Sequence, residues 1–370
     1  MNRPANEQPR ILIMAGGTGG HVYPALAVAR ALREAGAAVS WLGTERGLEA
    51  RVVPEAGFPI DYVRIAGLRG NGALGWLLAP WRIVRALSQG LAVLRRRRPQ
   101  AVLGMGGFAS GPGGLASWLL RYPLLIHEQN AAAGLTNRLL APAAIRVMEA
   151  FPGTFRAGLG ALLTGNPVRT EIAAIEGAGA RYARHSGPLR LFVVGGSLGA
   201  AALNRTVPAA LASVAEGSRP QVRHQTGNQH LDVTREAYRE AGVEAEVLPY
   251  IEDMAAAYAW ADLVVCRAGA LTVSELAAAG VPAILVPFPY AVDDHQTRNA
   301  RHLIDAGGAV LLPQPELSPE RLAELLDEFI RTGRERLRAM AESARRLARP
   351  EATARVAEQC LAAARGESLV

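Results

Sequence analysis

The sequence predicts an α/β protein with two Rossmann-like domains, each a parallel sheet with helices on both faces. Apolar segments of strand length alternate with segments of helix length along most of the 370 residues, and the pattern restarts near Arg190. Each half also begins with a buried-strand pattern that runs directly into a glycine-rich turn. With half of its residues hydrophobic, the chain is long enough for two packed domains of ordinary size.

In the first half, strand and helix patterns alternate without long interruptions. The expected strands are 11–15, 39–42, 62–65, 101–103 and 124–127, and the expected helices are 24–35, 48–56, 76–98 and 114–120. The stretch 99–120 carries no charge and is long enough to suggest a membrane span. Its many glycines instead favour a strand, a turn and a short helix.

The second half repeats the fold pattern without repeating the sequence. The expected strands are 190–194, 222–225, 247–248, 263–266 and 283–286, and the expected helices are 201–215 and 272–279. The turn-forming residues Gly165, Asn166 and Pro167 place the join between the halves near 163–169. A charged helical tail is expected after Pro350.

Composition excludes several classes of function. All 40 basic residues are arginine, against 33 acidic residues, so no lysine is available as a P-loop residue, Schiff base or general base. The chain has only two cysteines, which fits a reducing cytoplasm. The sequence has no Cys/His cluster and no Asp-x-Asp motif, so it gives no indication of a metal site. The first ten residues lack an apolar signal core. Few aromatic residues and no known motif argue against nucleic-acid binding.

The first glycine-rich turn, residues 16–21, combines four glycines with Thr18 and His21. Such a turn lets backbone N–H groups approach a phosphate, although a tight connection without a ligand remains the alternative. His21 stands at the start of a helix, where the dipole favours the neutral, proton-accepting imidazole. A capping or surface histidine is equally compatible with this position. A dinucleotide fingerprint fails here because Val22 occupies the position that needs a small residue.

The polar run 127–130 follows the strand pattern that ends near Ile126, where parallel sheets place ligands. Asn130 could hydrogen-bond sugar or diphosphate oxygens, and Glu128 could orient a base. The alternative is a polar loop that caps the next helix.

The second half offers comparable positions after its strands. The turn 195–200 is glycine-rich, and the segment 267–275 joins a strand to a helix whose first N–H groups would face an anion. Glu275 could accept hydrogen bonds from vicinal hydroxyls such as those of a ribose, or could simply stabilise the helix dipole. Gln296 could bind sugar hydroxyls, whereas Asp293 and Asp294 could be no more than helix caps.

Seven segments in this order resemble the bacterial MurG family: 16–21, 104–112, 127–130, 165–169, 195–200, 266–275 and 293–299. The resemblance covers nearly the whole chain. It implies a GT-B glycosyltransferase fold of two Rossmann-like domains with a cleft between them, in which the helix 352–364 returns to the N-terminal domain. Residues 1–166 plus 350–370 would form the acceptor- and membrane-facing domain, and residues 167–349 the UDP-GlcNAc-binding domain.

The resemblance also implies the substrates and the reaction. GlcNAc would pass from UDP-GlcNAc to the C4 hydroxyl of MurNAc in undecaprenyl-pyrophosphoryl-MurNAc-pentapeptide (lipid I), giving lipid II and UDP with inversion. The proposed base is His21, with Glu128 or a substrate group as alternatives. No cofactor and no obligatory metal are expected. The implied UDP-GlcNAc contacts are Thr18, Gly19, Gly20, Asn130, Arg169, Ser197, Ile251, Ala270, Leu271, Thr272, Val273, Ser274, Glu275 and Gln296.

Two positions depart from the family pattern. Leu198 stands where glutamine is common, and Phe108 stands where some members have tyrosine, so no polar side-chain contact is expected at either position.

A candidate membrane segment spans residues 76–85 and is followed by four arginines. The residues expected to contact lipid are Trp76, Leu77, Leu78, Trp81 and Ile83. An ordinary amphipathic core helix with a basic end is the alternative. With the family resemblance, we expect peripheral attachment to the anionic cytoplasmic face of the bacterial inner membrane, where cell-wall and division proteins are candidate partners.

Three other readings remain open from the sequence. The first is another GT-B transferase or an epimerase acting on UDP-GlcNAc, which would leave the membrane-like segment without a role. The second is a module that binds a nucleotide sugar without turnover. The third is an NAD-dependent oxidoreductase, for which Gly104–Ala109 gives only a weak glycine match.

Overall fold

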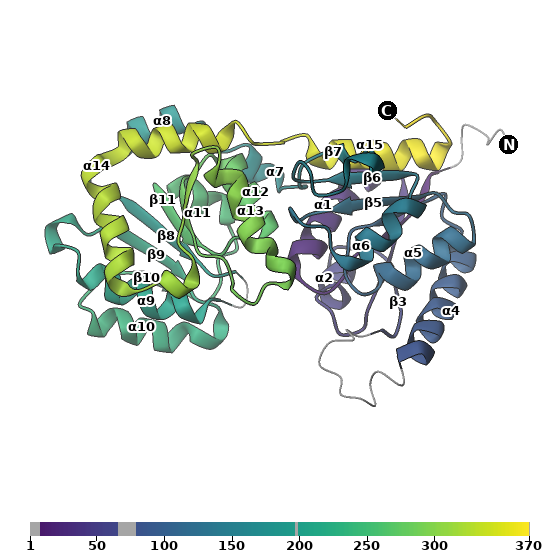
Figure 1. Ribbon diagram of the computed structural model, residues 1–370, viewed down its shortest axis with the longest axis horizontal. Coiled ribbons are helices and arrows are strands. Elements are labelled where there is room, and N and C mark those ends of the chain that lie inside the picture. The colour runs from purple at the N-terminus through teal and green to yellow at the C-terminus, as the bar shows by residue number, and fades with distance from the viewer. Residues whose placement is uncertain (1–7, 66–78, 197–198, 370) are drawn as a thin grey trace. The chain divides into compact units, whose positions relative to one another are not determined.

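The computed structural model describes residues 8–65, 79–196 and 199–369. The chain divides into two compact units (Figure 1). Unit 1 comprises Met1–Pro167 with Glu351–Val370, and unit 2 comprises Val168–Pro350. Each unit contains its own sheet, in which every strand pair is parallel.

The sheet of unit 1 has seven strands in the order β3-β2-β1-β4-β5-β6-β7. Their bounds are β1 Arg10–Met14, β2 Ala38–Gly43, β3 Ile60–Tyr62, β4 Ala101–Gly104, β5 Leu124–Glu128, β6 Arg146–Glu149 and β7 Leu162–Leu163. The chain reverses its direction of travel across the sheet between β1 and β4. Open parallel sheets bind ligands at the carboxyl ends of the strands beside such a switch point.

Helices cover both faces of this sheet. They are α1 Gly19–Glu34, α2 Glu49–Glu55, α4 Ala79–Arg97, α5 Ser110–Leu119, α6 Leu135–Leu140 and α15 Ala352–Arg365. One apolar core joins α1 and α15 to the sheet, and a second joins α4 and α5 to its other face. The C-terminal α15 thus packs on unit 1 although it follows unit 2 in the chain, as the family resemblance implied (Figure 1).

The sheet of unit 2 has six strands in the order β10-β9-β8-β11-β12-β13. Their bounds are β8 Arg190–Val194, β9 Gln221–Gln225, β10 Glu246–Leu248, β11 Leu263–Cys266, β12 Ala283–Leu285 and β13 Ala309–Leu311. The helices are α7 Thr170–Ala173, α8 Ala178–Arg184, α9 Ala201–Ala212, α10 Leu231–Glu240, α11 Met254–Trp260, α12 Ala270–Ala279, α13 His295–Ile304 and α14 Pro319–Arg345.

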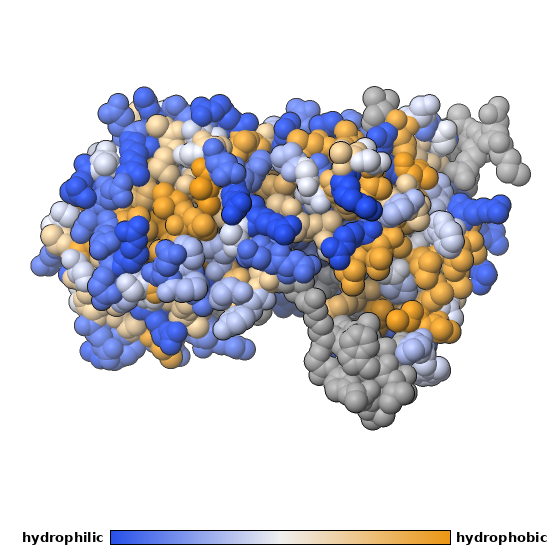
Figure 2. Space-filling view, viewed as in Figure 1, coloured by the Kyte–Doolittle hydropathy of each residue, from blue (hydrophilic) through white to orange (hydrophobic). Residues whose placement is uncertain are grey.

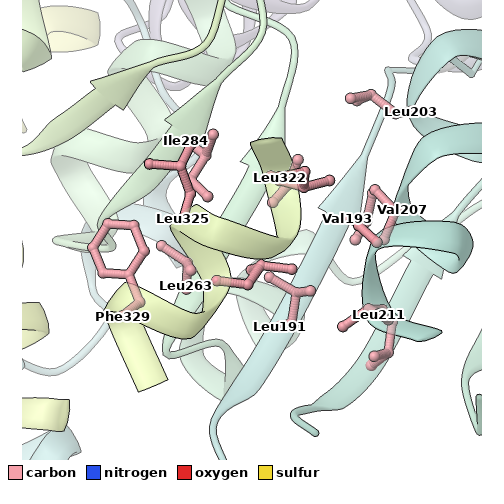
Figure 3. Packing of buried hydrophobic residues seen from close by; sticks show 14 of the residues in the cluster. Leu191, Val193, Leu203, Val207, Leu211, Leu263, Ile284, Leu322, Leu325 and Phe329 are labelled. Carbon is pink, nitrogen blue, oxygen red and sulfur yellow. The ribbon is translucent and has the colours of Figure 1, made fainter. Parts of the chain in front are cut away.

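The core of unit 2 forms because alternate strand residues point to opposite faces of the sheet. On one face, Leu191 and Val193 of β8 lie between side chains of α9 and α14 (Figure 3). On the other face, Phe192 packs edge-to-face against Tyr258 of α11, with 5.8 Å between ring centroids.

Short 3-10 segments occur in both units. The six in the described residues are Ala141–Ala143, Ala157–Leu159, Glu216–Ser218, Asn228–His230, Val292–Asp294 and Gln314–Glu316.

The predicted fold class is confirmed, and most predicted strands lie within two residues of the observed ones. Three helices begin earlier than predicted: α1 at Gly19, α5 at Ser110 and α12 at Ala270. The first turns of α1 and α5 contain glycines, so these turns lack the apolar periodicity from which a helix is predicted. The strand expected at 62–65 was misplaced, since β3 ends at Tyr62. The elements that were not predicted are strands β6, β7 and β13, the long helix α14, and helices α6, α7, α8, α10 and α11.

Candidate active site

The first glycine turn connects β1 to α1 and packs against the turn that follows β4. Thr18 is the N-cap of α1, so His21 lies in its first turn. A Cβ on Gly107 would lie 2.3 Å from the carbonyl oxygen of Gly16, and one on Gly106 would lie 2.7 Å from Cδ2 of His21. Only glycine permits these approaches. The His21 ring is therefore held against the β4 turn at the carboxyl edge of the sheet.

A carboxylate that the sequence analysis missed supports this turn from inside. Glu49 is fully buried. Its Oε2 accepts from the backbone N–H of Gly17 at 2.9 Å, and its Oε1 accepts from the N–H and the hydroxyl of Thr44 at 2.9 and 2.7 Å. A Cβ would lie within 2.6 Å of this side chain at each of three glycines: Gly16, Gly43 and Gly47.

This arrangement limits what the first turn can bind. The Gly17 N–H is already paired with Glu49, so it is not available to a phosphate in this conformation. The sequence signal that could have revealed the site is a single glutamate at the start of a helix, preceded by isolated glycines at 43 and 47.

The polar residues after β5 are mostly buried. The Nε2 of His127 lies 2.9 Å from the carbonyl oxygen of Gly165, and Nε2 of Gln129 lies 3.0 Å from His127 Nδ1. Complete burial lowers the pKa of His127 to about 4, so the imidazole is neutral at physiological pH. The carbonyl needs a donor, which places the proton on Nε2. These bonds connect β5 to the end of unit 1.

Glu128 is also buried and accepts four hydrogen bonds. Oε1 receives the backbone N–H and the side-chain amide of Asn130 at 3.0 and 3.2 Å, and Oε2 receives the N–H of Gly134 and the amide of Asn137 at 3.0 and 2.9 Å. Gly134 is the N-cap residue of α6. The carboxylate thus orients Asn130 and caps α6. This geometry suits a positioning role better than proton transfer.

In unit 2, the second glycine turn follows β8 and packs on the end of β9. Gly196 and Gly199 have φ values of +88° and +77°, and a Cβ on Gly199 would lie 1.8 Å from the carbonyl oxygen of Thr226. The Gln225 side chain donates to the carbonyl of Gly196 at 3.1 Å and accepts from the N–H of Ile251 at 2.9 Å. Gln225 therefore joins the turn to the segment containing Ile251. Ser197 and Leu198 lie outside the described residues.

A buried polar cluster of unit 2 is centred on Glu275 of α12. Oε1 of Glu275 accepts from Nη2 and Nε of Arg169 at 2.8 and 3.3 Å, and Oε2 accepts from the Tyr258 hydroxyl at 3.2 Å. Burial raises the pKa of Glu275, while Arg169 and the Tyr258 hydrogen bond act to lower it. Glu275 thus contacts Arg169, another of the residues expected to bind the donor, and also Tyr258, which was not predicted.

The other predicted donor contacts of unit 2 lie on loops or helix starts after β10, β11 and β12. Gly269 is the N-cap residue of α12. Oε1 of Gln296 accepts from the N–H of Phe288 at 2.8 Å. Asp294 is the N-cap of α13, and its carboxylate accepts from the Thr297 hydroxyl at 2.7 Å.

Part of the candidate membrane segment lies on α4. Trp81, Ile83 and Val84 are 61%, 42% and 65% exposed, and we call these three residues the α4 patch. The guanidinium of Arg85 lies 5.4 Å from the centre of a Trp81 ring. Trp76, Leu77 and Leu78 lie outside the described residues.

The α4 patch lies on a helix that also has a core face, because Ala86, Val93 and Leu94 of α4 are buried. Figure 2 shows hydrophobic residues on the surface of unit 1. Across residues 8–65, 79–196 and 199–369, no helix has the length and apolar character needed to cross a membrane.

Comparison with known proteins gives the family. Residues 11–149 match the glycosyltransferase family 28 N-terminal domain, and residues 190–356 match its C-terminal domain. The chain is 61% identical over 355 residues to a protein of Alkalilimnicola ehrlichii and 57% identical over 357 residues to one of Marinobacter nauticus. Both alignments cover 96% of this chain, with 99% and 98% of the respective relatives. Both relatives are described as UDP-N-acetylglucosamine–N-acetylmuramyl-(pentapeptide) pyrophosphoryl-undecaprenol N-acetylglucosamine transferases.

A solved structure agrees with the sequence comparison. The crystal structure of MurG from Acinetobacter baumannii matches with a TM-score of 0.83 and 43% identity, covering 95% of this chain and 99% of that one. Fold, family domains and full-length relatives all lead to one assignment: the chain belongs to the MurG family of GT-B N-acetylglucosaminyltransferases.

Proposed function

We propose that the chain transfers GlcNAc from UDP-GlcNAc to lipid I and so produces lipid II for peptidoglycan synthesis. The names of its relatives supply the two substrates. The observation in this chain that best supports the proposal is the Glu275–Arg169 pair on unit 2. A buried carboxylate that retains hydrogen-bonding capacity is suited to the vicinal hydroxyls of a ribose.

In this proposal, unit 2 is the UDP-GlcNAc-binding domain. Glu275 accepts from the ribose, while Arg169 and the Ile251 segment flank the uracil. The N–H groups at the start of α12 and the second glycine turn, with Ser197, bind the diphosphate. Gln296 contacts the GlcNAc. These N–H groups would stabilise the negative charge that develops on UDP as it leaves, without requiring a metal.

Unit 1 is proposed to bind the acceptor, with Thr18, Gly19, Gly20 and Asn130 also near the donor sugar. His21 receives the proton of the MurNAc C4 hydroxyl while UDP leaves from the opposite face of the anomeric carbon, which inverts its configuration. Glu128 orients Asn130 through two hydrogen bonds rather than acting as the base.

The acceptor lipid requires contact with a membrane. We propose that the α4 patch lies in the headgroup region of the cytoplasmic leaflet, with nearby arginines attracted to anionic lipid. The exposed Trp81 indole supports this placement, because an amphipathic ring of this kind favours the membrane interface. Cell-wall and division proteins remain candidate partners at that surface.

The test is transfer of radiolabelled GlcNAc from UDP-GlcNAc to a lipid I analogue, with EDTA present. Labelled disaccharide-lipid is expected. Product that forms only after Mg²⁺ is added would refute the metal-independent mechanism. If UDP-GlcNAc binds but no product forms in either condition, the chain is a binding module or uses another acceptor. An inverted product is expected to carry the β-anomeric coupling in its proton NMR spectrum.

A further inference from the structure

We propose that Tyr258 is a positioning residue for the sugar-nucleotide donor, because its hydroxyl holds the Glu275 carboxylate in the orientation that receives a ribose. This inference rests on the proposed function, in which Glu275 accepts hydrogen bonds from the ribose hydroxyls. Tyr258 lies on α11 and Glu275 on α12, and these two helices pack against each other.

The geometry distributes two different donors over the two carboxylate oxygens. Arg169 contacts Oε1 at 2.8 and 3.3 Å, whereas the Tyr258 hydroxyl donates to Oε2 at 3.2 Å. An ionised carboxylate offers about four lone-pair positions, two on each oxygen. The two N–H groups of Arg169 occupy both positions on Oε1, whereas the single Tyr258 hydroxyl leaves one position open on Oε2. A ribose hydroxyl could then donate to this remaining position on Oε2, the oxygen that Tyr258 orients.

The two donors also differ in how firmly they are held. The Arg169 side chain is 44% exposed, so solvent competes for its guanidinium. Tyr258 is only 1% exposed, and its ring is fixed edge-to-face on Phe192 of the central strand β8. Arg169 therefore contributes mainly charge, and Tyr258 mainly orientation.

Tyr258 is a dependable donor at neutral pH. Complete burial raises the pKa of its phenol well above the ordinary value, and the nearby Glu275 carboxylate raises it further. The hydroxyl therefore stays protonated, and because it faces a carboxylate its proton is directed to Oε2. Replacing Tyr258 with phenylalanine would keep the ring that packs on Phe192 and remove only this hydrogen bond.

The experiment compares the binding of UDP and 2′-deoxy-UDP by calorimetry in the wild-type protein, Tyr258→Phe and Tyr182→Phe. Tyr182 is the matched control, because it is buried in the same unit and its hydroxyl donates to the carbonyl of Asp262 at 2.6 Å, outside the proposed donor site. For Tyr258→Phe we expect UDP affinity to fall about tenfold and 2′-deoxy-UDP affinity to fall only about threefold. Tyr182→Phe should leave the ratio of the two affinities unchanged.

A second measurement separates positioning from general damage. With saturating acceptor, Tyr258→Phe should raise the KM for UDP-GlcNAc about tenfold and leave kcat within about twofold, since the lost contact acts on binding. An unchanged affinity ratio in Tyr258→Phe, or an equal change of the ratio in Tyr182→Phe, would overturn the inference.

Failure of the proposed function would look different. If wild-type protein binds UDP and 2′-deoxy-UDP equally, or if Glu275→Gln binds UDP normally, the ribose role of Glu275 is wrong and the Tyr258 inference falls with it. If both of those controls behave as proposed and only Tyr258→Phe is neutral, the ribose role stands and the positioning role alone is refuted.

Discussion

The two glycine turns share a strand–turn–helix plan but are supported by opposite chemistry. In unit 1 the acid Glu49 accepts a hydrogen bond from the N–H of Gly17, whereas in unit 2 the amide Gln225 donates one to the carbonyl of Gly196. The first support consumes a backbone donor and places a carboxylate beneath the turn. The second consumes an acceptor and adds no charge. We therefore expect an anion to bind more tightly at the second turn than at the first.

The same contrast assigns different tasks to the two turns. The first turn packs backbone to backbone against the β4 turn, and the His21 ring lies against that same turn. The second turn lies in the same unit as the other proposed donor contacts. In the proposed function, the first turn serves the acceptor chemistry and the second turn serves donor binding.

The largest expected effect comes from removing the proposed base on the first turn. His21→Ala should lower kcat by about 10²–10⁴-fold, the usual contribution of a positioned general base. The affinity for UDP should stay within about twofold, because the proposed UDP contacts are on unit 2. Steady-state kinetics with a lipid I analogue, together with calorimetry with UDP, would check both values. A variant with near wild-type kcat would remove His21 from the mechanism.

The second-largest effect is expected from Glu49→Gln, a substitution that tests whether Glu49 maintains the turn that contains His21. In either amide orientation of Glu49→Gln, the side-chain NH2 group must face the backbone N–H of Gly17 or of Thr44, which distorts the turn. We expect kcat to fall by about 10–100-fold and the free energy of unfolding to fall by about 1–3 kcal/mol.

Glu149→Gln is the matched control for this change. Glu149 is a buried carboxylate of the same unit, and it accepts from the N–H groups of Gly153 and Phe155. This variant should lose similar stability while keeping kcat within about threefold. Equal losses of kcat in both variants would show that Glu49 acts only through general stability.

The comparison also shows what could be predicted from the sequence. The glycine turns, the polar run after β5 and the start of α12 were identifiable because glycines and polar residues directly follow apolar strands. Glu49, Gln225 and Tyr258 were not identified. Each acts through a contact between segments distant in sequence, such as the 32 residues that separate Glu49 from Gly17, and no local pattern encodes that contact.

Helix starts were also misjudged for a physical reason. In α1 the helix begins with Gly19 and Gly20, which have low intrinsic helix propensity. Tertiary packing of Val22, Leu26 and Ala29 against the sheet stabilises this first turn despite the glycines. Local propensity therefore placed the start of α1 several residues too late.

A substitution at Gln225 can give the second turn a carboxylate support like that of the first turn. Gln225→Glu would remove the donor to the Gly196 carbonyl and introduce a negative charge beneath the proposed diphosphate site. We expect UDP affinity to fall about tenfold or more, while kcat at saturating donor stays within about threefold. Calorimetry would measure the affinity. Unchanged UDP binding would contradict an anion-binding role for this turn.

Each unit also contains a buried neutral histidine whose protonation should destabilise the fold. Burial lowers the pKa from 6.5 to about 4 for His127 and to about 3 for His224. Below pH 6.5 the unfolded chain binds protons that these folded sites do not, so unfolding becomes easier as the pH falls. The decrease in the free energy of unfolding that is due to His127 should level off near pH 4, at about 3 kcal/mol. The decrease that is due to His224 should continue to about pH 3.

Hydrogen exchange followed by mass spectrometry can separate the two units, because peptides containing β5 and β9 report on His127 and His224 respectively. Protection corrected for intrinsic exchange should fall in both peptides between pH 6.5 and 4. Protection that stays constant over this range would show that neither histidine is coupled to folding.

The smallest expected effect concerns the α4 patch on the surface of unit 1. A single exposed valine on the surface of unit 2 serves for comparison. Trp81→Ser should weaken partitioning onto vesicles containing anionic lipid about fivefold, since an interfacial indole contributes on the order of 1 kcal/mol. Val233→Ser is the control, because Val233 is 70% exposed but lies on unit 2. It should leave partitioning unchanged. Neither variant should alter turnover of a water-soluble lipid I analogue, because neither side chain is proposed to contact substrate. Equal vesicle binding by both variants would therefore refute the α4 patch as a membrane contact without affecting the proposed chemistry.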